Sequence, residues 1–417
     1  METFHIKGQK PLYGTVAVSG SKNAALPILA ASLLTDKPVI LERMPALSDI
    51  KVMCDILSAL GCSVASGAED TLIIETAGLS RHKLPYDLTG RLRGSFLVMG
   101  PLLARCGRVA ISLPGGCAIG ARPVDLHLKG LSALGATFKI TKGIIEGTAK
   151  KLVGTKIYLD FPSVGATENI MSAAVLAEGT TIIENAATEP EIVDLANFLC
   201  SMGGRILGAG SNTVKIIGVA GLTGTRYAIM PDRIEAGTLL TAAAITGGQV
   251  TVTGIRPDTL KPITAKFSEM NIPITIQNNT VTVEPRKTMR AVDIKTLPFP
   301  GFPTDMQAPM TALLSLSEGT GIITETVFEN RFMHTGELCR MGASIKVSGR
   351  NAVIEGKKSL SGAKVKATDL RAGAALVLAG LAARGDTEIS DIYHIDRGYD
   401  ALEKKLQSLG AEIERKP

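Results

Sequence analysis

The sequence predicts an α/β protein of two lobes, each made of three copies of one repeated unit, with helices inside and sheets outside. Three observations support this prediction: a recurring helix tail, short β-branched segments, and an Ala/Leu-rich helix at the head of each copy. The tails recur at an interval of about 70 residues, longer than the units of solenoid proteins. They occupy residues 55–62, 128–136, 195–204, 263–271, 335–343 and 402–411.

Each copy has the same internal order of elements. In one of them, an Ala-rich helix over residues 169–179 precedes a β-branched strand over 180–186, and a polar loop leads to the second helix. A residue in the C′ position closes that helix, and alternating strands such as 213–218 complete the unit. The closing residues are Gly61, Gly135, Gly203, Asn271, Gly342 and Gly410.

A unit of two helices and several strands is too large for one turn of a solenoid, so six units pack better as two groups of three. The first helices are rich in Ala and other small residues, which lets them approach one another closely in a buried position. The alternative is a pair of ordinary doubly wound α/β domains. Two lobes predict a ligand cleft between them.

The composition argues against several classes of protein. The chain of 417 residues has a formal charge of +6, and its Lys and Arg residues are scattered, whereas nucleic-acid binders show a basic stripe or run. The longest apolar stretches, 25–34 and 372–383, are shorter than the roughly 20 residues of a membrane span. The N-terminal segment lacks the apolar core of a signal peptide. We therefore expect a cytoplasmic protein that binds anionic small molecules rather than nucleic acid or membrane.

One of the six cysteines stands apart from the others. None lies in a CxxC pair, so we expect reduced thiols and no disulfide framework or zinc site. Five are interpreted as core residues. Cys117 instead lies in a glycine-rich loop, five residues before Arg122. An exposed loop and a nearby cation favour the thiolate, which makes Cys117 the candidate reactive thiol.

A candidate anion site lies where a strand that ends near Gly20 meets the start of a helix. Lys22 and Asn23 fall at this helix start, where free backbone amides and an ammonium group attract anions. A capped helix start without any ligand explains the same residues.

A second candidate is the loop over residues 299–310, in which three prolines closely precede Asp305 and a helix follows. A rigid loop can hold one carboxylate as a general base. The local sequence favours a competing interpretation, in which Thr304 or Asp305 caps the helix.

Three arginines occupy related places in their repeats. Arg331 and Arg397 lie between the strand and the second helix, and Arg122 has a similar position. Taken singly, each is expected to be a solvated surface residue. Loops at equivalent places on repeated units face a common surface, where several arginines would form a clamp for phosphate and carboxylate groups.

Five segments together resemble the UDP-N-acetylglucosamine enolpyruvyl transferase family. They are Lys22 with Asn23, the loop around Cys117, the loop around Asp305, and the segments around Arg331 and Arg397. The resemblance runs through essentially the whole chain. It implies two inside-out α/β barrel domains, each of three βαβαββ-type units, with the active site in the interdomain cleft. The implied domains are residues 22–229, and residues 1–21 plus 230–417.

The resemblance implies transfer of the enolpyruvyl group of phosphoenolpyruvate to the 3′-hydroxyl of UDP-N-acetylglucosamine with release of phosphate, the first committed step of peptidoglycan precursor synthesis. By resemblance, Cys117 is the acid, forms a covalent adduct and is the target of fosfomycin, and Asp305 is the base. No metal or other cofactor is implied, and a monomer is expected. The cations that hold the anionic groups of phosphoenolpyruvate are Lys22, Arg93, Arg122, Arg331 and Arg397.

The resemblance also assigns contacts to the nucleotide sugar. The chain departs from many family members at Phe161, which follows Asp160 where they carry Lys, so we expect one contact to the nucleotide to differ. His127 and His394 fall in the motif segments and are interpreted as residues that support the loops. The assigned contact residues are Asn23, Arg122, Pro123, Val124, Asp125, Leu126, Ser163, Val164, Gly165, Asp305, Val327 and Arg331.

Three rival interpretations remain. A 3-phosphoshikimate enolpyruvyl transferase shares the repeat fold, but its N-terminal Asp-Lys-Ser pattern is absent and the cysteine loop is not expected in it. A non-catalytic nucleotide-sugar-binding paralogue would have lost Cys117 or Asp305, and both are present. A nucleic-acid-processing protein built on similar repeats would show a basic face and a catalytic histidine motif.

Overall fold

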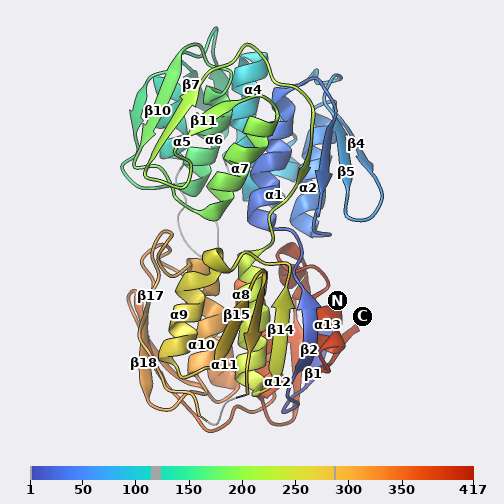
Figure 1. The fold of residues 1–417 in the computed structure, drawn as a ribbon, viewed down its shortest axis with the longest axis vertical. Helices are drawn as coiled ribbons and strands as arrows, with labels where there is room; N and C mark the ends of the chain where they lie inside the picture. The colour runs from blue at the N-terminus through green and yellow to red at the C-terminus, as the bar shows by residue number, and fades with distance from the viewer. Residues whose placement is uncertain (1, 114–123, 286–287) are drawn as a thin grey trace. The chain divides into compact units, whose positions relative to one another are not determined.

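The computed structural model describes residues 2–113, 124–285 and 288–417, and they form two compact units. The first, here called the terminal unit, contains residues 2–19 and 231–417, so both ends of the chain belong to it (Figure 1). The second, here called the central unit, contains residues 20–113 and 124–230. None of the helices in the described part of the chain combines the length and hydropathy of a membrane span.

The central unit carries three small sheets around a group of helices. The sheets, in strand order, are β13 (Thr225–Ala228), β3 (Val39–Glu42), β5 (Leu72–Glu75) and β4 (Ser63–Ser66); β6 (Arg108–Ser112), β8 (Ile144–Thr148) and β7 (Thr137–Thr141); and β11 (Arg205–Leu207), β12 (Thr213–Ile217), β10 (Thr180–Glu184) and β9 (Lys156–Tyr158). The helices are α1 (Lys22–Ala31), α2 (Ser48–Ala59), α3 (Tyr86–Arg91), α4 (Met99–Cys106), α5 (Asp125–Ala133), α6 (Val164–Ala174) and α7 (Pro190–Ser201), with 3-10 turns η1 (Ser32–Leu34) and η2 (Arg93–Val98).

The terminal unit repeats this plan. Its sheets, in strand order, are β21 (Lys364–Lys366), β22 (Asp386–Ser390), β1 (Thr3–Lys7) and β23 (Glu412–Lys416); β15 (Ile274–Gln277), β16 (Thr280–Val283), β14 (Gln249–Thr253) and β2 (Tyr13–Ala17); and β17 (Ile294–Lys295), β18 (Thr320–Thr324), β20 (Asn351–Glu355) and β19 (Ser344–Ser348). Its helices are α8 (Arg233–Thr246), α9 (Lys261–Glu269), α10 (Gln307–Leu314), α11 (His334–Arg340), α12 (Leu370–Ala382) and α13 (Leu402–Ser408), with 3-10 turns η3 (Pro257–Leu260), η4 (Thr304–Met306) and η5 (Ile392–Arg397).

The same pairing pattern recurs in these sheets. In five of them a parallel pair of strands, such as β9 with β10 or β17 with β18, is extended by antiparallel neighbours. The sheet of β6, β8 and β7 has a single parallel bridge, Lys83 to Ala110, in place of its fourth strand. Six small mixed sheets replace the two wide parallel sheets of doubly wound domains, so that alternative was wrong.

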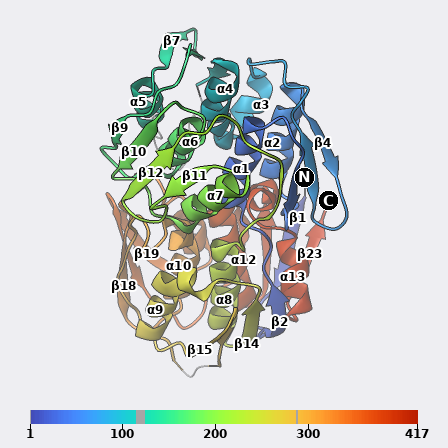
Figure 2. The same cartoon turned by 45° about the horizontal axis from the view of Figure 1, so that its top comes forward.

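The first helix of each repeat lies inside its unit and the sheets lie outside, as predicted, whereas the second helices expose one face to solvent (Figure 2). In the terminal unit α8, α10 and α12 pack against one another and are buried along almost their whole length. In the central unit α6 packs against α1, α4 and α5. Small side chains make this close packing possible: Cβ atoms at Gly100 and Gly130 would come within 2.2 Å and 2.1 Å of Asn169 and Ile170 on α6.

The six residues that close the second helices all adopt left-handed backbone conformations. Their φ angles range from 60° at Asn271 to 104° at Gly135. Glycine and, among other residues, asparagine tolerate this region, which is why the sequence marks each helix end so clearly. The repeat prediction is therefore confirmed residue by residue.

The cysteine prediction was only partly right. The five described cysteines carry free thiols, as expected. Cys62 is buried, Cys54 and Cys106 are half-buried, and Cys200 and Cys339 are exposed. Cys200 and Cys339 lie near the ends of α7 and α11 on the faces turned toward solvent, so the interpretation of all five as core residues was wrong.

Candidate functional site

Lys22 begins α1, and its side chain is buried. The hydroxyl of Ser21 accepts a hydrogen bond from the Ala24 amide, so the helix start is capped, as one of the two interpretations predicted. The Lys22 ammonium donates to Asp49 Oδ2 at 3.1 Å. Asp49 is buried as well, so the Lys22 ammonium forms part of a buried ion pair at the start of the helix.

Asp305 lies in η4, immediately before α10. The cap residues of η4 and α10 are Pro303 and Met306, so the interpretation of Thr304 or Asp305 as a cap was wrong. Asp305 Oδ1 accepts from Arg331 Nη2 at 2.7 Å, and Oδ2 accepts from Arg371 Nη2 at 2.9 Å and Nε at 3.3 Å. Charge-assisted bonds of this kind are about twice as strong as neutral ones, so the two arginines bind the carboxylate in preference to a capping role.

The Asp305 carboxyl is ionised at neutral pH. Burial disfavours its charged form, but the guanidinium groups of Arg371 and Arg331 outweigh burial and hold its pKa well below the ordinary value. A quarter of its side chain remains exposed, at 25%. The two arginines that bind the carboxylate are buried, at 1% and 3% exposed.

Arg371 binds Asp305 and is the member of this arrangement that sequence reasoning missed. It lies in the first turn of α12 and stacks 5.0 Å from the centroid of the Tyr399 ring. The Tyr399 hydroxyl is hydrogen-bonded to Thr238 of α8 at 2.9 Å, which fixes the ring. No motif marked Arg371, but a single arginine in an otherwise apolar helix signals a buried charge that requires a partner.

Arg331 and Arg397 occupy the loops that the repeat predicted. Arg331 lies in the turn between β18 and α11, and Arg397 ends η5, between β22 and α13. Judged by itself, Arg331 was expected to be a solvated surface residue. That expectation was wrong, because Asp305 and Thr304 bind its guanidinium in the interior. Arg397 follows Asp396, whose carboxylate accepts from Arg415 at 2.6 Å and 3.0 Å, so the backbone beside it is anchored.

Two helix starts meet in the central unit. Val124 precedes α5, whose first residues are Asp125 and Leu126. Ser163 caps α6 by accepting from the Ala166 amide, and Val164 and Gly165 follow it. A Cβ atom at Gly165 would come within 3.1 Å of the His127 ring, so the predicted sugar-contact residues of both helices lie side by side.

His127 supports this pair of helix starts, as interpreted from the sequence. Its Nδ1 accepts from Asn169 Nδ2 at 3.0 Å, which leaves the proton on Nε2. Asn169 is itself fixed by hydrogen bonds to Phe96 and Gly100. Burial, and then the charge of Arg93, lower the pKa of His127 to about 3, so it is a neutral hydrogen-bond donor rather than a cation.

The remaining predicted residues are placed as follows. Val327 follows β18, and its amide donates to Glu325 at 2.8 Å. Phe161 is 47% exposed, next to Asp160, which binds Lys129 at 2.7 Å. His394 stacks on Tyr393, with ring centroids 4.1 Å apart. Cys117, Arg122 and Pro123 lie outside the described residues.

Sequence comparison identifies the family. Residues 6–406 match the family described as EPSP synthase (3-phosphoshikimate 1-carboxyvinyltransferase). The chain is 56% identical over 415 residues to UDP-N-acetylglucosamine 1-carboxyvinyltransferase 1 of Caldanaerobacter subterraneus, covering 99% of both chains. It is 57% identical over 417 residues to UDP-N-acetylglucosamine 1-carboxyvinyltransferase 2 of Carboxydothermus hydrogenoformans, covering 100% of this chain and 99% of the relative. The chain belongs to the UDP-N-acetylglucosamine 1-carboxyvinyltransferase family. It is an enzyme of the transferase class.

Solved structures agree on the fold of this UDP-N-acetylglucosamine 1-carboxyvinyltransferase family member. The enolpyruvyl transferase NikO from Streptomyces tendae matches with a TM-score of 0.91 at 28% identity, covering 99% of this chain and 98% of the other. EPSP synthase from Acinetobacter baumannii matches with a TM-score of 0.78 at 18% identity over 100% of both chains, which supports the fold alone. The predicted fold of two repeated α/β barrels is thus confirmed.

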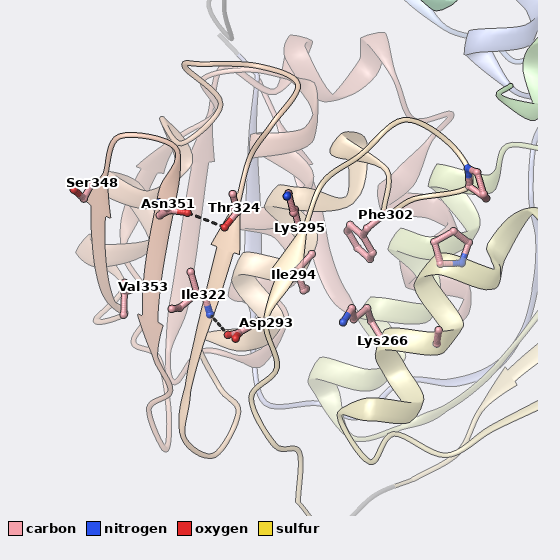
Figure 3. Close-up of a pocket in the computed structure, with 13 residues that line it drawn as sticks. Lys266, Asp293, Ile294, Lys295, Phe302, Ile322, Thr324, Ser348, Asn351 and Val353 are labelled. Carbon is pink, nitrogen blue, oxygen red and sulfur yellow. Dashed lines mark hydrogen bonds between the residues drawn. The ribbon is translucent and has the colours of Figure 1, made fainter. Parts of the chain in front are cut away.

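A separate groove of about 870 Å³ lies on the terminal unit, between α9 and the sheet of β17, β18 and β20 (Figure 3). Its lining includes Lys266, Lys295, Phe302, Ile322 and Val353, and it contains none of the predicted site residues. The groove is therefore distinct from the groups of predicted residues described above. Among the described residues, no group of three or more His, Cys, Asp or Glu side chains is arranged to hold a metal ion.

Proposed function

We propose that this protein transfers the enolpyruvyl group of phosphoenolpyruvate to the 3′-hydroxyl of UDP-N-acetylglucosamine. The observation that carries the proposal is identity of 52–57% over 98% or more of the chain with relatives that bear this activity in their names. The ionised Asp305 carboxylate, held by two buried arginines, supports it. The product is an enolpyruvyl nucleotide sugar, and its place is at the start of peptidoglycan precursor synthesis.

The reaction proceeds by addition and elimination. The sugar hydroxyl oxygen forms a bond to C2 of phosphoenolpyruvate while C3 gains a proton and the hydroxyl loses one. The resulting tetrahedral intermediate then loses a proton from C3 and expels phosphate, which regenerates the double bond. The step therefore requires one acid, one base and cations around the phosphate and carboxylate.

We assign Asp305 as the base in this scheme and Cys117 as the acid that also forms the covalent adduct. A carboxylate with a lowered pKa is a weak base toward a free alcohol. It becomes adequate as the bond to C2 forms, because the attacking hydroxyl turns acidic in the transition state. The fixed, ionised carboxylate is thus suited to accept a hydrogen bond from the hydroxyl first and its proton later.

Cations complete the proposed site. Lys22, Arg93, Arg122, Arg331 and Arg397 are assigned to the anionic groups of phosphoenolpyruvate and its tetrahedral intermediate. The support is strongest for Arg331, whose guanidinium is already fixed beside Asp305 at 2.7 Å. We assign the two predicted domains, 22–229 and 1–21 plus 230–417, to the central and terminal units, from which, among the described residues, they differ only at residues 20, 21 and 230.

The start of α6 and the start of α5 are assigned to the nucleotide sugar. Backbone amides at a helix N-terminus attract phosphate, and both helices begin beside the neutral His127 donor. The residues proposed for these contacts are Asn23, Arg122, Pro123, Val124, Asp125, Leu126, Ser163, Val164, Gly165 and Val327.

Mass spectrometry of the reaction product tests the proposed function. Purified protein is incubated with phosphoenolpyruvate and UDP-N-acetylglucosamine, and the nucleotide sugar is analysed before and after. We expect a mass gain of one enolpyruvyl group on the sugar and an equal amount of free phosphate. A sugar of unchanged mass, with shikimate 3-phosphate modified in a parallel reaction, would instead support the activity named for the wider family.

A further inference from the structure

Glu325 is a fully buried carboxylate to which the proposed reaction assigns no role. It follows the last residue of β18 and is 0% exposed. Its Oε1 accepts from the Thr296 hydroxyl at 2.8 Å and from the amides of Val327 at 2.8 Å and Phe328 at 3.1 Å. Its Oε2 accepts from the Thr304 hydroxyl at 2.8 Å. Four donors converge on one side chain, and they come from three different segments.

Thr304 connects the hydrogen bonds of Glu325 to those of Asp305 through Arg331. Its hydroxyl has one proton, which it donates to Glu325, so its oxygen is free to accept from Arg331 Nη1 at 2.9 Å. The other terminal nitrogen of Arg331 donates to Asp305 Oδ1 at 2.7 Å. A guanidinium only donates, so the direction of every bond from Arg331 is fixed.

We propose that Glu325 is a positioning residue for catalysis, which acts through Thr304 and Arg331 to fix the Asp305 carboxylate. We call the chain Glu325–Thr304–Arg331–Asp305 the relay. The inference rests on the proposed function, because it gives Asp305 a catalytic role. Glu325 also holds the Val327 amide, so one buried carboxylate fixes both the loop before α10 and the loop after β18.

Replacement of Glu325 by Gln conserves the shape of the side chain but reverses the direction of one hydrogen bond. If the amide oxygen stays opposite the Val327 and Phe328 amides, its NH2 group faces Thr304 and donates to it. The Thr304 hydroxyl must then turn its own proton away while its oxygen receives two donors. If the Gln side chain is rotated by 180°, its NH2 group faces the N–H groups of Val327 and Phe328, and neither side can accept a hydrogen bond. In the first case Thr304 must accept from Gln and Arg331 together, and in the second the loop after β18 must shift, so either arrangement disturbs the alignment of Arg331 with Asp305.

A double-mutant cycle on kcat tests the relay. Glu325→Gln and Thr304→Val are each expected to lower kcat roughly tenfold to a hundredfold, since each removes one link of a charge-assisted chain. The double variant should be no slower than the slower single variant, because both changes break the same chain. In Thr304→Val, which leaves the Val327 amide on Glu325, KM for the nucleotide sugar should stay within about threefold of the wild-type value.

Two further variants provide controls. Thr304→Ser keeps the hydroxyl and should retain kcat within about threefold of wild type, and its comparison with Thr304→Val can still overturn the relay if Glu325→Gln fails to fold. Thr326→Val removes a hydrogen bond of 2.6 Å between the Thr326 hydroxyl and the Thr296 carbonyl, which joins two of the same segments outside the relay. Its kcat should be near that of wild type, and its effect should add to that of Glu325→Gln.

Two results would overturn the relay. One is a double variant whose loss of kcat equals the product of the single losses, which would mean that Glu325 only braces the fold through Val327 and Phe328. The other is equal kcat in Thr304→Ser and Thr304→Val. The wild-type protein separates this failure from that of the proposed function, because a wild type that releases no phosphate with UDP-N-acetylglucosamine overturns the proposed function itself.

Discussion

Replacement of Asp305 by Asn removes the negative charge that lies between the buried guanidinium groups of Arg331 and Arg371. Arg371 is 1% exposed and Arg331 is 3% exposed, so neither can regain full hydration in the variant. The Asn oxygen can still accept from one arginine, but its NH2 group then faces the other. Loss of one partner from a buried ion pair costs about 3–5 kcal/mol, and we expect about 3 kcal/mol because a quarter of the Asp305 side chain is exposed.

The pH dependence of this stability difference follows from the lowered pKa of Asp305. A carboxyl whose folded pKa lies below its unfolded value of about 3.9 contributes its full stability above that value. The contribution is lost only as the pH falls through the folded pKa. The difference between wild type and Asp305→Asn should therefore be constant between about pH 5 and pH 8. Activity should fall by at least about a hundredfold, since the general base is lost.

Urea unfolding followed by circular dichroism at several pH values measures the difference. Asp160→Asn is the matched control, because Asp160 pairs with Lys129 at 2.7 Å on the surface, where a salt bridge contributes about 1 kcal/mol or less. If the stability difference between wild type and Asp305→Asn shrinks as the pH rises from about 5 to 8, the effect of burial on Asp305 outweighs that of the two arginines. The pKa of Asp305 would then be raised rather than lowered. That result would refute the electrostatic description of the site.

Other residues give further predictions. Cys117→Ala should abolish or severely reduce turnover with an unchanged circular dichroism spectrum, and fosfomycin should label wild type at Cys117 alone; label on another cysteine would contradict the assignment of the acid. Phe161→Lys, which adds a cation beside the start of α6, should lower KM for the nucleotide sugar about threefold to tenfold, whereas a change only in KM for phosphoenolpyruvate would disprove the placement. The ring protons of His127, whose pKa is lowered to about 3, should show no titration shift by NMR between about pH 5 and pH 8. A shift in that interval, assigned by comparison with His127→Asn, would mean that the imidazole becomes charged.

The repeated fold could be predicted in detail because its signals are local. Each second helix ends at a residue with positive φ, and only Gly and Asn serve well there, so Gly61 to Gly410 mark the period directly. The alternation of buried and exposed residues in short strands such as β12 predicts one-sided sheets. These features depend on neighbours within a few residues, which a sequence displays in full.

The site could be predicted only where a residue stands in an unusual local setting. Asp305 stands out among prolines, but its local context favours a helix cap, and only Arg331 and Arg371, 26 and 66 residues away along the chain, decide otherwise. Arg371 gives only a weak local signal, as the single arginine of an Ala-rich helix, and Glu325, directly after an ordinary strand, gives none. Their importance comes from partners that the fold brings together.

The rate of phosphate release with two different acceptors tests the central claim most directly. Phosphoenolpyruvate is supplied with either UDP-N-acetylglucosamine or shikimate 3-phosphate, and wild type is compared with Asp305→Asn. We predict that wild type releases phosphate only with the nucleotide sugar and that the variant nearly loses this activity. Phosphate release that is faster with shikimate 3-phosphate, or equal in wild type and variant, would contradict the account.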